Sequence, residues 1–100
     1  MENEIKVNEH QVYVRLAGKM YAHDAGVIRD NLIEKIEQGA VEIRMDLSSV
    51  LYIDSSGLGV LVTVYKRMKE INGRFVLVGV CGIVEELLKR TRLDKILLIE

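Results

Sequence analysis

The stretch Asp54-Ser55-Ser56-Gly57-Leu58-Gly59 brings a carboxylate, two hydroxyls and two glycines together where an apolar segment gives way to a helix. A helix start leaves about four backbone N–H groups without partners inside the helix and carries partial positive charge. A hydroxyl at this position therefore either caps the helix or accepts a phosphate group on electrostatically favourable ground. We expect the chemistry of the chain to lie at this junction.

An alternating segment precedes this junction and a helical segment follows it. Apolar residues alternate with charged ones over residues 41–47, which predicts a strand with one packed face. Residues 48–53 are then expected to form an apolar loop that leads into the motif. From Gly57 to about Asn72 the apolar residues recur at helical spacing, and Gly73 supplies the stop.

The first forty residues predict a hairpin and a helix. Residues 5–7 and 12–16 alternate between apolar and polar side chains on either side of a polar break, which is typical of two paired strands ending near Gly18. Residues 24–38 have apolar side chains at steps of three and four, so we expect an amphipathic helix there. Asp24 is placed to cap the start of that helix.

The remaining residues predict a buried strand, a third helix and a last strand. Residues 75–78 are apolar without alternation, as in a strand covered on both faces. Gly82 then opens a helix, and residues 96–99 form the final strand. Strands joined by a short turn pair antiparallel, whereas strands joined through a helix are usually parallel. The order ββαβαβαβ therefore predicts one α/β domain over residues 1–100, with a mixed five-stranded sheet and three helices.

The composition limits the classes of partner and compartment. A chain of 100 residues with 49% hydrophobic content is enough for one compact core. The formal net charge is -1, so nothing draws the chain broadly to nucleic acid or to an anionic membrane. The start lacks a signal-peptide pattern, and no apolar run approaches the roughly 20 residues that span a bilayer, so we expect a cytoplasmic protein. Cys81, the only cysteine, is expected to be a small buried side chain.

Catalytic and metal-binding sites find little support in the sequence. A serine hydrolase elbow needs a glycine two residues before the serine, where this chain has Ile53 and Asp54. His10 lies in the expected hairpin turn and His23 just before the first helix, and with a single cysteine they give no metal-ligand spacing. We therefore predict no enzyme activity, no bound metal and no cofactor.

Several alternatives stay open at the helix start itself. Gly57-Leu58-Gly59 would suit a phosphate-binding loop in a nucleotide or small-ligand sensor, although Val62 stands where a third glycine would complete the pattern. Val60 and Val64 lie one turn apart, either in the core or in an exposed apolar strip beside Ser55. Ser55 is either an ordinary N-cap, worth about 1 kcal/mol, or a phosphate acceptor. A phosphate there would add about -1.5 to -2 charges and act mainly on a partner docked over the helix start.

Two blocks of the sequence resemble the STAS domain of the anti-sigma factor antagonist family, and the resemblance runs almost end to end. The more specific block is MDLSSVLYIDSSGLG at residues 45–59, and the second is LLKRTRLDKI at residues 87–96. The resemblance implies a partner-switching regulator that binds a serine kinase, which also acts as an anti-sigma factor, and thereby frees the sigma factor. The kinase then phosphorylates the serine directly after the aspartate, which maps to Ser55, and a serine phosphatase resets it.

The resemblance also implies where the partner binds and which alternatives remain. Ser55 is the expected phosphorylation site, and the expected partner-binding residues are Asp54, Ser55, Ser56, Gly57, Leu58, Gly59 and Val60. A STAS scaffold or accessory subunit of a stress-signalling or lipid-transport complex would use the same surface without being switched. Relatives often carry an acidic residue near the position of Tyr21, and they commonly add a C-terminal helix, whereas this chain ends at Glu100. We expect a monomer or a weak dimer that binds neither nucleic acid nor membrane.

Overall fold

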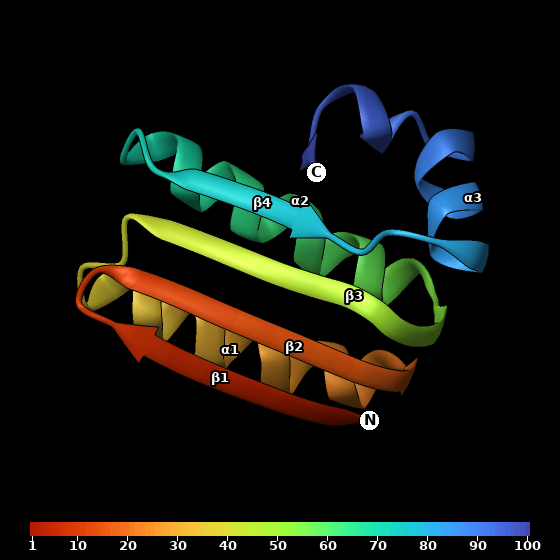
Figure 1. Cartoon of the computed structure of the whole chain (residues 1–100), viewed down its shortest axis with the longest axis horizontal. Coiled ribbons are helices and arrows are strands. Elements are labelled where there is room, and N and C mark those ends of the chain that lie inside the picture. The colour runs from red at the N-terminus through yellow and green to blue at the C-terminus, as the bar shows by residue number, and fades with distance from the viewer.

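The computed structural model describes residues 1–100 as a five-stranded sheet with three α-helices (Figure 1). The elements follow in the order β1 (Glu2–Asn8), β2 (Gln11–Met20), α1 (Ala22–Glu37), β3 (Glu42–Ile53), α2 (Ser55–Glu70), β4 (Arg74–Val78), α3 (Gly82–Arg90) and β5 (Leu98–Ile99). The strands lie side by side in the order β1-β2-β3-β4-β5. β1 and β2 are antiparallel and the other pairs are parallel, which confirms the predicted mixed sheet and the order ββαβαβαβ.

Helices α1 and α2 lie next to each other on one face of the sheet (Figure 1). Successive side chains of a strand point to opposite faces of the sheet. In the first halves of β2 and β3, every second side chain therefore points into the core between the sheet and these helices. The buried strand residues are Val12, Val14, Leu16, Ile43, Met45 and Leu47. α1 contributes Ala25, Ile28, Leu32 and Ile36, at the spacing that the sequence predicted. One continuous core of 23 buried residues results, and its burial fixes how α1 and α2 sit on the sheet.

Strand β3 is longer than the sequence predicted, because residues 48–53 continue the strand and do not form a loop. β3 pairs with β2 as far as Met20 and Ile53, with shifts in register between Arg15 and Ala17 and between Gly18 and Lys19. Such irregularities break the two-residue alternation by which a strand is recognised. As a result, β3 delivers the chain to the first helical residue of α2 with only Asp54 between them.

Both long helices begin two residues earlier than predicted. α1 starts at Ala22, so Asp24 lies in its first turn and is not the residue before the helix. Asp24 Oδ2 instead accepts a hydrogen bond from the Tyr21 N–H at 3.1 Å, as the acidic member of a capping box does. This backbone hydrogen bond lowers the pKa of Asp24. His23, expected before the helix, is also part of its first turn.

The end of the chain departs from the prediction in two places. The last strand comprises only Leu98 and Ile99, and a 3-10 turn at Leu93–Lys95 precedes it. Ile96 is 54% exposed, so the apolar run that suggested a longer strand is only partly used for packing. Cys81 is exposed and does not lie in the core, because the chain leaves the sheet after β4 before it enters α3.

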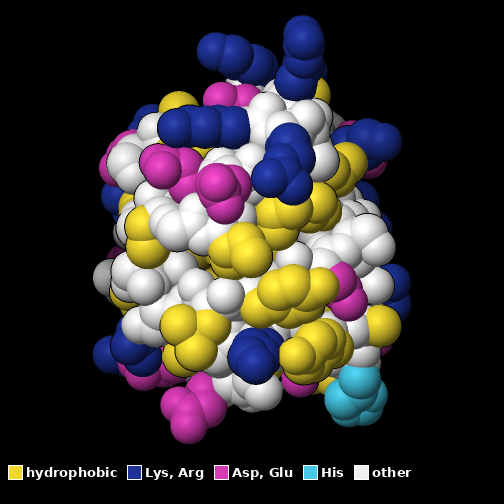
Figure 2. Space-filling model, turned by 90° about the vertical axis from the view of Figure 1, so that its right-hand side faces the viewer, with side chains coloured by type: hydrophobic (Ala, Val, Ile, Leu, Met, Phe, Trp, Pro, Cys, Tyr) yellow, Lys and Arg dark blue, Asp and Glu magenta, His cyan; other side chains and the backbone are white.

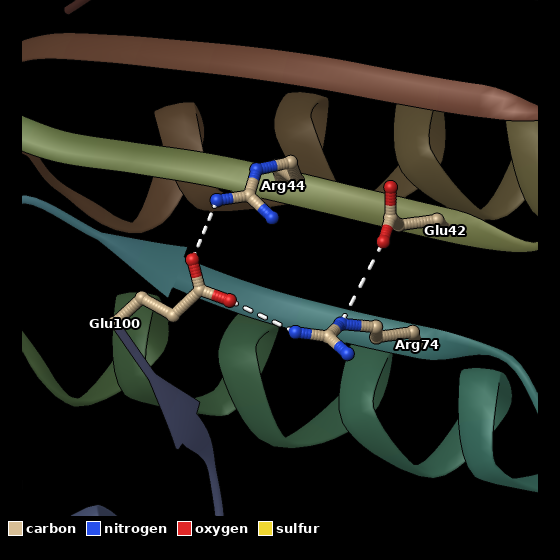
Figure 3. A network of polar contacts seen from close by, with 4 residues as sticks. All are labelled: Glu42, Arg44, Arg74 and Glu100. Carbon is tan, nitrogen blue, oxygen red and sulfur yellow. Dashed lines mark hydrogen bonds and ion pairs between the residues drawn. The ribbon is translucent and has the colours of Figure 1, made fainter.

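Ion pairs fasten the last residue to the neighbouring strands (Figure 3). Glu100 Oε1 accepts a hydrogen bond from Arg44 Nη2 at 2.7 Å, and Glu100 Oε2 accepts one from Arg74 Nη2 at 2.8 Å. Arg74 Nε also lies 3.6 Å from Glu42 Oε1. The contact with Arg44, and then that with Arg74, lowers the pKa of Glu100. The network therefore links β3, β4 and the residue that follows β5.

Candidate functional site

Asp54 is the residue that caps helix α2. Its Oδ1 atom accepts hydrogen bonds from the N–H groups of Ser56, at 2.9 Å, and Gly57, at 3.2 Å. Its backbone carbonyl accepts the first hydrogen bond of the helix, from the Leu58 N–H. The interpretation of Ser55 as the N-cap is therefore wrong, because the strand ends one residue earlier and brings Asp54 to the cap position.

Ser55 is the first helical residue of α2, and its side chain is exposed. Capping is already done by Asp54, and the Ser55 hydroxyl takes no part in the side-chain hydrogen bonds at the helix start. Ser56, by contrast, is partly buried. The geometry therefore distinguishes the two serines, and Ser55 presents the more accessible hydroxyl.

The two glycines of the motif have different surroundings. Gly57 is buried, and a Cβ added there would collide with the Ile53 side chain and approach Met20 Sδ to 2.8 Å. Gly57 therefore allows the first turn of α2 to pack closely on the ends of β2 and β3. A Cβ at Gly59 would meet no atom within 4 Å, so this glycine leaves open space.

The two valines that follow the motif belong to the core. Val60 is 4% exposed and Val64 is fully buried, so the suggested apolar strip beside Ser55 is absent from the surface. Leu58 is partly buried. Of the expected partner-binding residues, Gly57 and Val60 therefore lie beneath the surface that the others form.

The helix start is poorly suited to hold the phosphates of a nucleotide. Backbone N–H groups at a helix start bind phosphate when they point at open solvent. Here the N–H groups of Ser56 and Gly57 already donate to the Asp54 carboxylate. A phosphate would have to displace this carboxylate or lie beside its negative charge. The structure thus argues against the nucleotide sensor that the Gly57-Leu58-Gly59 pattern suggested.

Two exposed apolar residues, Tyr21 and Leu51, lie close to this helix start in sheet pairing or in sequence. Met20 pairs with Ile53 in the sheet, so the residues that follow them, Tyr21 and Asp54, leave the sheet side by side. Tyr21 is 51% exposed and Leu51 is 69% exposed. The Tyr21 ring lies 5.7 Å from that of Tyr52, at 43°. We call Tyr21 and Tyr52, together with the exposed Leu51 that precedes Tyr52 in β3, the aromatic patch.

The aromatic patch lies on the face where β2 and β3 end and α1 and α2 begin. Figure 2 looks at this end of the molecule and shows hydrophobic side chains gathered across its middle. Exposed apolar clusters of this kind mark surfaces that bind other proteins. The sequence shows two large apolar residues at Leu51 and Tyr52, but it predicts a loop there, and residue type alone does not tell whether such side chains are exposed.

The two histidines lie in different parts of the fold. His10 lies in the turn between β1 and β2, and His23 lies at the start of α1. No three His, Cys, Asp or Glu side chains gather as a metal site requires. No helix has both the length and the hydropathy to cross a membrane.

The chain matches known proteins over nearly its whole length. The STAS domain family matches residues 2–100. The anti-sigma-B factor antagonist of Bacillus subtilis is 40% identical over 70 residues, which are 70% of this chain and 63% of that protein, so the match spans less than two thirds of that relative. The anti-sigma-B factor antagonist of Listeria monocytogenes is 30% identical over 97% of this chain and 88% of its own length.

Solved structures share the fold. Protein TM1081 of Thermotoga maritima superposes with a TM-score of 0.89 at 29% identity, covering 96% of this chain and 83% of that one. The Bacillus cell fate determinant SpoIIAA in its phosphorylated form gives a TM-score of 0.82 at 22% identity, covering 99% and 91%, a likeness of fold alone. Together with the relatives in sequence, these findings establish that the chain belongs to the anti-sigma factor antagonist family of STAS domains.

Proposed function

We propose that this chain is a cytoplasmic anti-sigma factor antagonist that binds an anti-sigma factor serine kinase and is released when the kinase phosphorylates Ser55. It acts as a binding protein and not as an enzyme. The observation that carries the proposal is the exposed Ser55 hydroxyl on the first residue of α2, directly after the capping Asp54. The sequence and fold of the anti-sigma factor antagonists support the choice of partner.

The geometry of the helix start explains how one phosphate would act as a switch. A phosphoserine adds about -1.5 to -2 charges and three acceptor oxygens. The Asp54 carboxylate already accepts from the Ser56 and Gly57 N–H groups, so a phosphate on Ser55 would project toward solvent. A docked partner would then face two adjacent anionic groups. The phosphate would therefore weaken the complex while leaving the fold intact.

The docking surface comprises the exposed and partly exposed residues of the helix start together with the aromatic patch. Asp54, Ser55, Ser56, Leu58 and Gly59 form the first part, and Gly57 and Val60 support it from below. Tyrosines are common among the residues that carry most of an interface's binding energy. In this proposal the aromatic patch contributes most of the affinity for the kinase, and phosphorylation of Ser55 regulates whether the kinase binds. We further propose that a serine phosphatase removes the phosphate from Ser55, and we expect the chain to be a monomer or a weak dimer.

Phosphate mapping tests this proposal. The chain is incubated with the serine kinase of its own host and ATP, and the phosphate is located by mass spectrometry. We expect incorporation at Ser55 in the unaltered chain and in Ser56→Ala, the matched control, and none in Ser55→Ala. Kinase binding should persist in Ser55→Ala and be lost in Ser55→Asp.

Two results would count against the switch. Absence of phosphate at Ser55, combined with undiminished kinase binding by Ser55→Asp, contradicts it. Equal binding by Ser55→Ala and Ser55→Asp to a partner that never phosphorylates the chain would indicate the scaffold or accessory-subunit role.

A further inference from the structure

A groove lies between helices α1 and α2, and its lining includes Ser56, the sequence neighbour of Ser55. It has a volume of about 390 Å³ and is lined by residues of both helices. Ser56 lines it near the start of α2, Thr63 lies two turns further along, and Arg29 contributes a positive charge from α1. Gly59, which lies one helical turn after Ser55 on the same face of α2, also lines the groove, so Ser55 lies close to one end of it.

Two glycines keep this groove open. Gly26 in α1 and Gly59 in α2 both line it. A glycine inside a helix destabilises it by roughly 1 kcal/mol relative to alanine, so it normally has a reason in packing or backbone conformation. Neither reason applies here, because a Cβ at either position would meet no atom within 4 Å and neither residue has a positive φ. The fold does not require glycine at these two positions. We therefore take the effect of the missing side chains to be the open space in the groove.

Arg29 gives the groove a charge preference. No carboxylate lines the groove. The ion pair of Arg29 is with its sequence neighbour Asp30, at 3.3 Å between Nη2 and Oδ1, and the two side chains are 48% and 73% exposed. An exposed ion pair of this kind contributes little to the stability of the fold, so little is lost when Arg29 exchanges Asp30 for another partner. A guanidinium so placed can form paired hydrogen bonds with a carboxylate brought by another chain.

We propose that the groove receives a segment of the kinase partner, with side chains lying over Gly26 and Gly59 and an Asp or Glu that pairs with Arg29. This inference rests on the proposed function and names the chemistry by which the partner is recognised. Ser55, one helical turn before the groove-lining Gly59, would then lie close to the docked segment. A phosphate there would bring negative charge next to an acidic segment, which adds repulsion to the loss of contact.

Filling the groove without disturbing the fold is the direct test. The affinity of the kinase is measured by calorimetric titration for the unaltered chain and for Gly26→Ala, Gly59→Ala, Gly26→Leu and Gly59→Leu. The melting temperature is recorded for each variant. We expect the alanine variants to melt at the same or a higher temperature and the leucine variants to bind at least about tenfold more weakly.

A charge test runs beside it. Arg29→Gln should also weaken binding about tenfold. Arg67→Gln is the control, because Arg67 also makes a surface ion pair, with Glu37 of α1 at 4.0 Å, but lies near the other end of α2 and does not line the groove. Its affinity should remain that of the unaltered chain.

The outcomes separate this inference from the function on which it rests. If the leucine variants and Arg29→Gln bind the kinase normally while Ser55→Asp does not, the groove inference is wrong and the switch stands. If the groove variants lose binding while Ser55→Asp binds normally, the groove is supported and the switch fails. If the unaltered chain does not bind the kinase, both are overturned.

Discussion

Asp54 and Ser55 are neighbours in different environments. Asp54 satisfies the N–H groups of the first helical turn, and this leaves the Ser55 hydroxyl exposed and free of a structural role. The sequence located this helix start, and the resemblance to the family predicted Ser55 as the phosphorylation site. It did not assign the cap correctly, because Asp and Ser are almost equally good N-caps and only the end of β3 decides between them.

The two environments predict unequal effects on stability. Asp54→Ala should lower the free energy of unfolding by about 1 kcal/mol, because two N–H groups lose their acceptor. Ser55→Ala should change it by less than about 0.5 kcal/mol, as expected of a surface substitution. Urea denaturation measures both. A larger loss for Ser55→Ala than for Asp54→Ala would show that Ser55 caps the helix after all.

The two glycines of the motif predict a second contrast. Gly57→Ala should destabilise the protein by about 1–3 kcal/mol, because the new methyl group overlaps Ile53 and crowds Met20. Gly59→Ala should leave stability unchanged or raise it, since the methyl group enters open space and alanine favours the helix. The melting temperatures of the two variants are compared by thermal unfolding. Similar melting temperatures would contradict the close packing at Gly57.

At the scale of elements, the sequence predicted every helix and strand but misjudged several of their ends. The sequence predicts a loop at residues 48–53, although they extend β3, because shifts in pairing with β2 interrupt the alternation by which a strand is recognised. The last strand was overestimated because Ile96 is apolar and yet lies on the surface. Boundaries of this kind depend on tertiary contacts, and local pattern carries little information about them.

The short strand β5 is followed by an ion-pair network whose effect depends on pH. Arg44 and then Arg74 hold the pKa of Glu100 below its ordinary value. A carboxyl group whose folded pKa is depressed stabilises the fold above its unfolded pKa, about 4.3 for glutamate, and this contribution is lost as the pH falls through the folded pKa.

Glu100→Gln should therefore unfold at a lower urea concentration than the unaltered chain at pH 7, and the difference should shrink on acidification below about pH 4. The effect on stability will be small, because the Glu100 side chain is 42% exposed and water screens its ion pairs. The control is Glu86→Gln, because Glu86 is an exposed acid on α3. This substitution should lower the urea midpoint at pH 7 by less than Glu100→Gln does. A difference that persists unchanged at about pH 3 would show that the ion pairs are not its origin.

At the scale of the molecule, one end carries the candidate functional features. The helices α1 and α2 begin where β2 and β3 end (Figure 1), so Ser55, the aromatic patch and the groove residues Ala22 and Ser56 all belong to this end of the molecule. The sequence predicted the architecture, but it did not reveal the patch or the groove. Both depend on which side chains of adjacent elements remain uncovered, and this is decided by packing.

The aromatic patch predicts where binding energy lies. Tyr21→Ala and Leu51→Ala should each weaken kinase binding by about 1–2 kcal/mol, because large exposed side chains at an interface centre carry much of its affinity. Stability should change little, since both side chains are exposed. Val41→Ala is the matched control: Val41 is equally exposed at 51% but precedes β3, at the opposite end of that strand. Normal binding by both patch variants would remove the patch from the interface.

The most direct measurement compares the affinity of the host's serine kinase for the chain before and after complete phosphorylation at Ser55, with the unfolding free energy of both forms determined in parallel. We predict that phosphorylation weakens binding by about a hundredfold or more, whereas the unfolding free energy changes by less than about 1 kcal/mol. Equal affinities for the two forms would contradict the account, and so would a loss of binding that is accompanied by unfolding of the chain.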